Sequence, residues 1–157
     1  MADIKDPENT LILETSKGRA VISLRPDLAP NHVARIKELA RKGFYDGTPF
    51  HRVIEGFMAQ GVDPTGTGTG GSGKKLKAEF NRQPHKRGTA SMARAQSPDS
   101  ADSQFFICFG DAGFLDGQYT VWGEVVEGME NIDKFKRGEP VREPDRIVSM
   151  KVAADVT

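Results

Sequence analysis

Short strand-like segments follow one another along most of this chain of 157 residues, and many of them are separated by glycine-containing turns. Apolar residues alternate with polar ones in these segments or form short continuous runs, and both patterns are typical of β-strands. Two other stretches, residues 31–42 and 128–136, have the apolar spacing of helices. The strand-like segments are residues 10–15, 19–24, two within 50–61, 89–93, 103–109, 119–126 and 146–154.

This succession predicts a mainly β fold, a closed eight-stranded antiparallel β-barrel capped by two α-helices. Closure is expected because it removes the exposed edges on which an open sheet could pair with another chain. In the longer helix, one stripe should pack against the sheet, and the helix should end at Gly43. That stripe consists of Val33, Ile36, Leu39 and Ala40.

The length of the chain suits one domain, which we expect to span residues 1–157. Residues 1–9 are polar and contain Pro7, so they should form a loose lead-in. The 22 basic and 22 acidic side chains cancel, which argues against a nucleic-acid partner.

A single cysteine, Cys108, excludes an internal disulfide, and no apolar run near the N-terminus is long enough for a signal peptide or a membrane span. We therefore expect a cytoplasmic monomer without a membrane partner. Cys108 lies in the strand-like run 103–109 and should be a small core residue and not a catalytic thiol. In that run Phe105 and Phe106 must point to opposite faces.

Residues 50–61 place one permanent cation, Arg52, among apolar side chains. If the stretch is a pair of strands with a break at Glu55-Gly56, Met58 and Gln60 share one face, and Arg52 points from the other strand to a common surface. Such a surface would be a shallow apolar pocket with hydrogen-bond donors at its edge. The stretch holds neither a nucleophile beside a base nor a metal-ligand cluster, so we expect no metal and no cofactor.

Glycine-rich residues 66–71 match the spacing of a dinucleotide fingerprint, and residues 68–74 nearly match a phosphate loop. A phosphate site also needs a helix immediately afterwards, whereas the sequence breaks at Asn81 and Pro84. We therefore interpret this segment as a surface loop, and a nucleotide-binding protein is the third-ranked function.

Several separated motifs resemble those of the cyclophilins, which are peptidyl-prolyl cis-trans isomerases. The likeness covers about residues 10–153 and is carried, in order, by residues 50–61, 91–93, 103–107 and 115–117. It implies an eight-stranded barrel with a helix over each opening and an active groove on the outer wall. The implied substrates are proline-containing peptides and unfolded or folding proteins.

The resemblance also implies a role for each matching residue. Arg52 would be the catalytic residue, and His51 beside it would have no role as a base. Gln60 and Gln104 would flank the pocket and orient the peptide or Arg52, while Ala93 and Arg94 would line the strip where the substrate backbone pairs. The proline ring would be held by Phe57, Met58, Phe106 and Leu115.

Three groove residues depart from the pattern of animal cyclophilins and look like bacterial cytosolic members. Arg94 stands in place of asparagine, Phe114 in place of tryptophan, and Tyr119 in place of histidine. Because phenylalanine lacks the indole N–H, the resemblance implies weak cyclosporin binding. A non-catalytic module that grips proline segments is the alternative to an isomerase, and the charge of Arg52 favours the isomerase.

Overall fold

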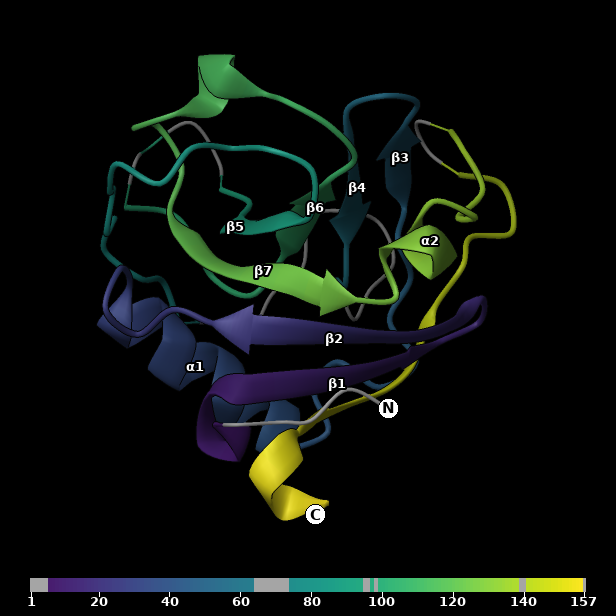
Figure 1. Cartoon of the computed structure of the whole chain (residues 1–157), viewed down its shortest axis with the longest axis horizontal. Coiled ribbons are helices and arrows are strands. Elements are labelled where there is room, and N and C mark those ends of the chain that lie inside the picture. Colours follow the sequence, from purple (N-terminus) through teal and green to yellow (C-terminus); the bar gives the residue numbers. More distant parts are fainter. Residues whose placement is uncertain (1–5, 64–73, 95–96, 98, 139–140, 157) are drawn as a thin grey trace.

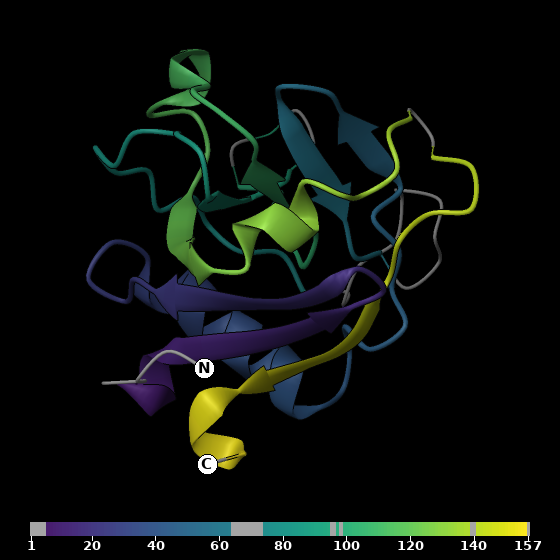
Figure 2. The same cartoon turned by 45° about the vertical axis from the view of Figure 1, so that its right-hand side comes forward.

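Within the described part of the chain, eight strands form one antiparallel sheet in the order β3-β4-β6-β5-β7-β2-β1-β8. The computed structural model describes residues 6–63, 74–94, 97, 99–138 and 141–156. The α-helices of the described residues, α1 (Pro30–Arg41) and α2 (Met129–Ile132), are separated in both views of the molecule (Figures 1 and 2). The strands are β1 (Thr10–Thr15), β2 (Gly18–Leu24), β3 (Arg52–Ile54), β4 (Met58–Gly61), β5 (Thr89–Met92), β6 (Phe105–Cys108), β7 (Val121–Glu127) and β8 (Ile147–Val152).

The sheet is open, so the prediction of a closed barrel is wrong. Strands β3 and β8 stand at the two ends of the order and do not pair with each other. The outer edge of β3 is instead occupied by Gly138, which exchanges two backbone hydrogen bonds of 2.8 Å with Val53. An isolated bridge between Pro49 and Arg146, with backbone hydrogen bonds from Phe50 to Asp145 and from Ile147 to Thr48, links the segments around the starts of the two end strands. Pro49 has no N–H to extend that bridge into a ladder. The result is a half-barrel.

The main core lies between one face of the sheet and α1. The predicted helical stripe is confirmed, since Val33, Ile36, Leu39 and Ala40 are all buried. Gly43 adopts a φ of +72° directly after the helix, a conformation that glycine tolerates without steric cost. The helix packs against β8, whereas the single turn of α2 packs against β2.

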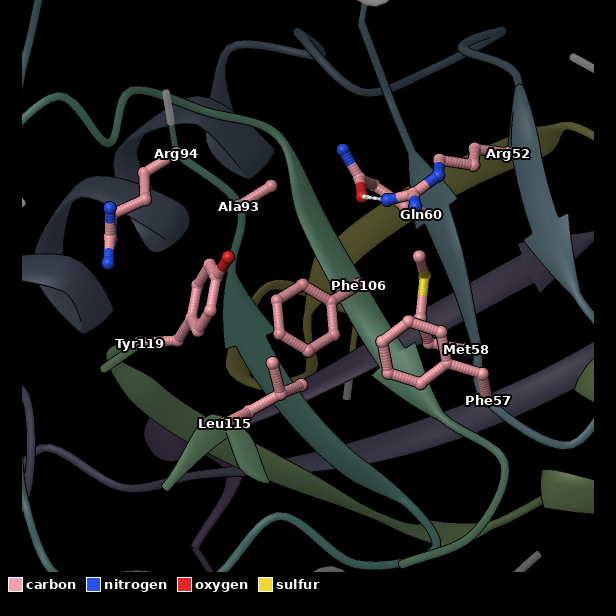
Figure 3. A pocket seen from close by; sticks show the side chains of 9 residues that line it. All are labelled: Arg52, Phe57, Met58, Gln60, Ala93, Arg94, Phe106, Leu115 and Tyr119. Carbon is pink, nitrogen blue, oxygen red and sulfur yellow. Dashed lines mark hydrogen bonds between the residues drawn. The ribbon is translucent and has the colours of Figure 1, made fainter. Parts of the chain in front are cut away.

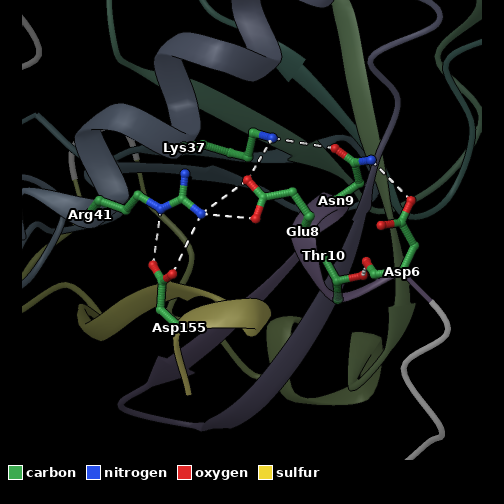
Figure 4. A network of polar contacts seen from close by, with 7 residues as sticks. All are labelled: Asp6, Glu8, Asn9, Thr10, Lys37, Arg41 and Asp155. Carbon is green, nitrogen blue, oxygen red and sulfur yellow. Dashed lines mark hydrogen bonds and ion pairs between the residues drawn. The ribbon is translucent and has the colours of Figure 1, made fainter. Parts of the chain in front are cut away.

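The N-terminal segment is less loose than the sequence predicted. Pro7–Asn9 form a short 3-10 helix, η1, and Glu8 accepts two 3.0 Å hydrogen bonds from Arg41 of α1 (Figure 4). Arg41 also donates to Asp155 at 3.1 Å, in the 3-10 helix η3 (Ala153–Asp155). One guanidinium therefore ties both η1 and η3 to α1, while residues 1–5 of the predicted lead-in lie outside the described part of the chain.

Candidate active site

The hairpin of β3 and β4 brings the predicted polar residues together. Gly56, with a φ of +72°, makes the turn at the predicted break. Arg52 then lies opposite Gln60, and Ile54 lies opposite Met58. Directly opposed residues point to the same face of an antiparallel sheet, so the predicted common surface of Arg52, Met58 and Gln60 is confirmed.

Strand β6 continues this surface. Its Phe106 lies opposite Gln60 of β4 and opposite Ser91 of β5, and so belongs to the same face. Phe105 points the other way, into the main core, where its ring meets Trp122 edge-on at 5.2 Å. The opposite orientations predicted for the two phenylalanines are therefore confirmed.

A second, smaller apolar cluster lies on this outer face. Its buried members are Met58, Ala93, Phe106, Cys108 and Ala112, and the partly buried side chains against it are Ile54, Phe57, Leu115 and Tyr119. Cys108 is fully buried, and burial raises the pKa of its thiol to about 12. A thiol with so high a pKa stays protonated near neutral pH, which agrees with the predicted core role.

The cluster forms the floor and walls of a cavity of about 130 Å³. Figure 3 shows Arg52 and Gln60 on one side of the Phe106 ring, with Tyr119 and Arg94 on the other. The side chains that line the cavity are Arg52, Phe57, Met58, Gln60, Ala93, Arg94, Phe106, Leu115 and Tyr119.

Arg52 is held at the rim by its strand neighbour. Its Nη1 donates a 3.2 Å hydrogen bond to Oε1 of Gln60 (Figure 3). The guanidinium is partly exposed, and arginine keeps its charge at any working pH. The arrangement is a fixed cation with several donors beside an apolar hollow, which suits it to stabilise a polar atom of a bound peptide.

Two of the residues predicted to bind substrate do not line this cavity. Phe114 belongs to the 3-10 helix η2 (Gly113–Leu115), is 67% exposed, and lies with its ring 5.4 Å from that of Phe57. Gln104 presents its backbone to the site, since its carbonyl oxygen accepts a 3.0 Å hydrogen bond from the N–H of Ala93. Both residues therefore neighbour the cavity.

A buried polar group behind the cavity was not assigned to the site from the sequence. His85 is 2% exposed, and its ring stacks on Phe106 with centroids 6.0 Å apart. Its Nδ1 lies 3.0 Å from the carboxylate of Asp116, and its Nε2 lies 3.0 Å from the hydroxyl of Ser91. Burial lowers the pKa of His85, although Asp116 opposes that shift. His85 thus packs behind the cavity as a buried, hydrogen-bonded side chain.

No local pattern could have located His85, because its partners lie up to 31 positions away in the sequence. Phe80 was also missed: its ring lies beneath the Arg94 guanidinium, with 5.9 Å between the ring centroid and Cζ. A long-range contact of this kind leaves no periodic signal in the sequence.

No group of three or more histidine, cysteine, aspartate or glutamate side chains among the described residues could hold a metal ion. Likewise, none of the described helices has both the length and the apolar character needed to cross a bilayer. The glycine-rich residues 66–71 lie outside the described residues.

Comparisons with known proteins agree with the geometry. The family model of the cyclophilin type peptidyl-prolyl cis-trans isomerases matches residues 10–152. A probable peptidyl-prolyl cis-trans isomerase of Brucella suis is 51% identical, over 98% of this chain and 87% of that protein.

Two solved structures are also similar. The crystal structure of a cyclophilin from Hirschia baltica has a TM-score of 0.88 and 33% identity, covering 97% of this chain and 76% of that one. A Cryptosporidium parvum cyclophilin, crystallised in the presence of the dipeptide Ala-Pro, has a TM-score of 0.84 and 28% identity. The match covers 91% of this chain and 98% of that one. The chain therefore belongs to the cyclophilin-type peptidyl-prolyl cis-trans isomerases.

Proposed function

We propose that Arg52 catalyses rotation about Xaa-Pro peptide bonds while the neighbouring cavity holds the proline ring. The observation that carries this proposal is the placement of one guanidinium, fixed by Gln60, at the rim of an apolar cavity. The substrates we propose are proline-containing segments of unfolded or folding proteins in the cytoplasm. Family membership supports the reaction, and the single, buried thiol of Cys108 suits a reducing compartment.

The reaction breaks no bond. The barrier to rotation is roughly 20 kcal/mol and arises from amide resonance, which is lost in the twisted state as the prolyl nitrogen regains its lone pair. A catalyst therefore needs only to bind the twisted amide better than the planar one. An N–H of Arg52 is suited to donate to that nitrogen, or to the adjacent carbonyl oxygen, without any proton transfer.

The cation supplies only part of the required stabilisation. Raising a rate constant of about 10⁻² per second to about 10³ per second lowers the barrier by ~7 kcal/mol. One charge-assisted hydrogen bond contributes about 1.5 to 3 kcal/mol of this amount. We assign the remainder to immobilising the ring against Phe106, Met58 and Leu115 and to excluding water from the amide.

The test is isomerisation of an Ala-Pro peptide by the wild type, by Arg52→Ala and by Arg52→Lys. Losing ~3 kcal/mol of transition-state stabilisation slows Arg52→Ala on the order of 100-fold, and lysine restores the charge but not the fork of donors. Circular dichroism should show that both variants fold. If a folded Arg52→Ala keeps a third or more of wild-type activity, the cavity grips proline by a mechanism that does not use this charge.

A further inference from the structure

Arg94 carries a second fixed cation at the cavity. Its Nε and Nη2 donate hydrogen bonds of 3.1 and 2.8 Å to the carbonyl oxygen of Gln118. Its Cζ lies 4.7 Å from the ring centroid of Tyr119 and 5.9 Å from that of Phe80, distances typical of cation–π contacts. The guanidinium head is thus positioned before any substrate arrives.

The anchor of Arg94 is itself ordered. The Gln118 N–H donates to the carbonyl oxygen of Leu115 at 3.0 Å, and its side-chain Nε2 donates to that of Phe114 at 3.1 Å. The carbonyl oxygen and the two aromatic rings that contact the Arg94 guanidinium carry no formal negative charge. Because the Arg94 side chain is already ordered, it loses little additional conformational entropy when it pairs with a bound group.

The cavity is electropositive. Its lining, which lies wholly within the described residues, includes two arginines and no carboxylate. Glu79, the neighbour of Phe80 in the sequence, is turned toward α1, where it accepts hydrogen bonds of 3.2 and 2.8 Å from the N–H groups of Asn31 and His32. A cleft lined by one sign of charge attracts ligands of the opposite sign.

Arg94 is also close enough to meet a residue near the proline. The Tyr119 ring beneath it meets Phe106 edge-on, with centroids 5.6 Å apart, so a single ring separates the guanidinium from the cavity floor (Figure 3). An extended peptide advances by ~3.3 Å per residue. A side chain within three residues of the bound proline can therefore reach Arg94.

We propose that Arg94 is a specificity-determining residue that favours substrates with an aspartate or glutamate within three residues of the isomerised proline. The inference rests on the proposed function, because it places the proline ring in the cavity beside Phe106. Arg94 acts on substrate selection, while Arg52 acts on the twisted amide.

The experiment uses peptides that differ only in carrying glutamate, its uncharged isostere glutamine, or lysine at a single position, which is one of the three before or the three after the proline. Exchange measured by NMR gives kcat/KM without a coupling protease. We expect the wild type to prefer glutamate about fivefold at positions on one side of the proline, which corresponds to ~1 kcal/mol. Added salt should reduce the preference.

Three variants test whether Arg94 causes the preference for glutamate. It should vanish in Arg94→Gln and shift toward lysine-containing peptides in Arg94→Glu, while Lys151→Gln should keep it. Lys151 is an exposed cation on β8, at an end of the sheet order away from the cavity, so its variant controls for net charge. Equal rates of the wild type on glutamate and glutamine peptides, or a preference that persists in Arg94→Gln, would overturn the proposed role of Arg94. The proposed isomerase function would stand in either case. If the wild type isomerises none of the peptides, both this role and the proposed function are wrong.

Discussion

The imidazole of His85 lies nearly parallel to the ring of Phe106, with 19° between the planes and 6.0 Å between the centroids. Phe106 has the cavity on one side and a buried, hydrogen-bonded histidine on the other. The wall that we propose to hold the proline ring is therefore packed against a polar group that does not line the cavity.

His85→Ala should lower both stability and activity. It opens a void behind Phe106 and removes the imidazole contacts of Ser91 and Asp116, at a cost of about 2 to 4 kcal/mol in the free energy of unfolding. His32→Ala is a matched control, since His32 is also fully buried but bonds Glu79 at 2.7 Å and lies outside the cavity lining. We expect denaturant titration to show destabilisation of both variants, whereas kcat/KM on an Ala-Pro peptide should fall in His85→Ala alone. Equal activities in the two variants would show that the cavity wall does not need this support.

Stability should decrease on acidification while turnover changes little. Burial lowers the pKa values of His85 and His32 in the folded protein, so below the reference value of 6.5 the unfolded chain binds protons more readily. The resulting stability is complete above pH 6.5 and is lost as the pH falls toward the folded pKa values. The lowered pKa of Asp116, caused first by the backbone N–H of His85, extends the loss below 3.8.

Thermal unfolding between about pH 7.5 and 5 checks this decrease. His32→Gln with His85→Gln should reduce it to the contribution of His51, whose pKa burial also lowers. Turnover between about pH 6 and 9 should be nearly constant, because the proposed mechanism includes no proton transfer. A bell-shaped rate profile centred near 6.5 would instead indicate a histidine, with His51 the first candidate.

Truncating the ring pocket should reduce kcat/KM. In Met58→Ala or Phe106→Ala the proline ring loses packing area, and with it part of the burial that orients the amide. Met150→Ala provides a control for lost stability, since Met150 is fully buried in the main core on β8. At a temperature where all three proteins are folded, a loss of activity in Met150→Ala as large as in Met58→Ala would contradict the pocket assignment.

Phe114→Trp should raise cyclosporin affinity at least tenfold while changing turnover on a short peptide less than threefold. The resemblance to cyclophilins implies that an indole N–H here donates to the drug, and a missing donor costs about 1 to 3 kcal/mol. The 67% exposure of Phe114 beside Phe57 leaves room for the larger ring. Calorimetric titration should show the gain in Phe114→Trp and none in Phe114→Leu. Equal cyclosporin affinities of Phe114→Trp and the wild type would mean that Arg94 and Tyr119, and not Phe114, cause the weak binding of the drug.

Local patterns predicted the strands and the shared face of the site. The two-residue period on either side of Gly56 was sufficient to bring Arg52 opposite Gln60, because a tight turn fixes the register of a hairpin. The helical stripe from Val33 to Ala40 was equally readable, since burial against a sheet requires that spacing.

Contacts between distant segments were not predictable in this way. The edge of β3 is occupied by Gly138, and no periodic pattern in the sequence indicates this contact. The rule that sheets close to remove their edges therefore predicted a closed barrel, which is wrong. The ion pair between Glu8 and Arg41 likewise depends on where α1 lies, and it orders Pro7–Asn9, a segment whose composition indicated a loose chain. His85 reaches Phe106 only through the pairing of β5 with β6.

The buried thiol of Cys108 can be used to measure how often the apolar cluster beneath the cavity opens. It is the single thiol among 157 residues, it is inaccessible, and it belongs to the same cluster as Phe106. A thiol-directed reagent can react only when that cluster transiently opens, so the labelling rate measures the opening equilibrium without reference to catalysis. A proline peptide seated above the cluster should slow the labelling, and His85→Ala should accelerate it.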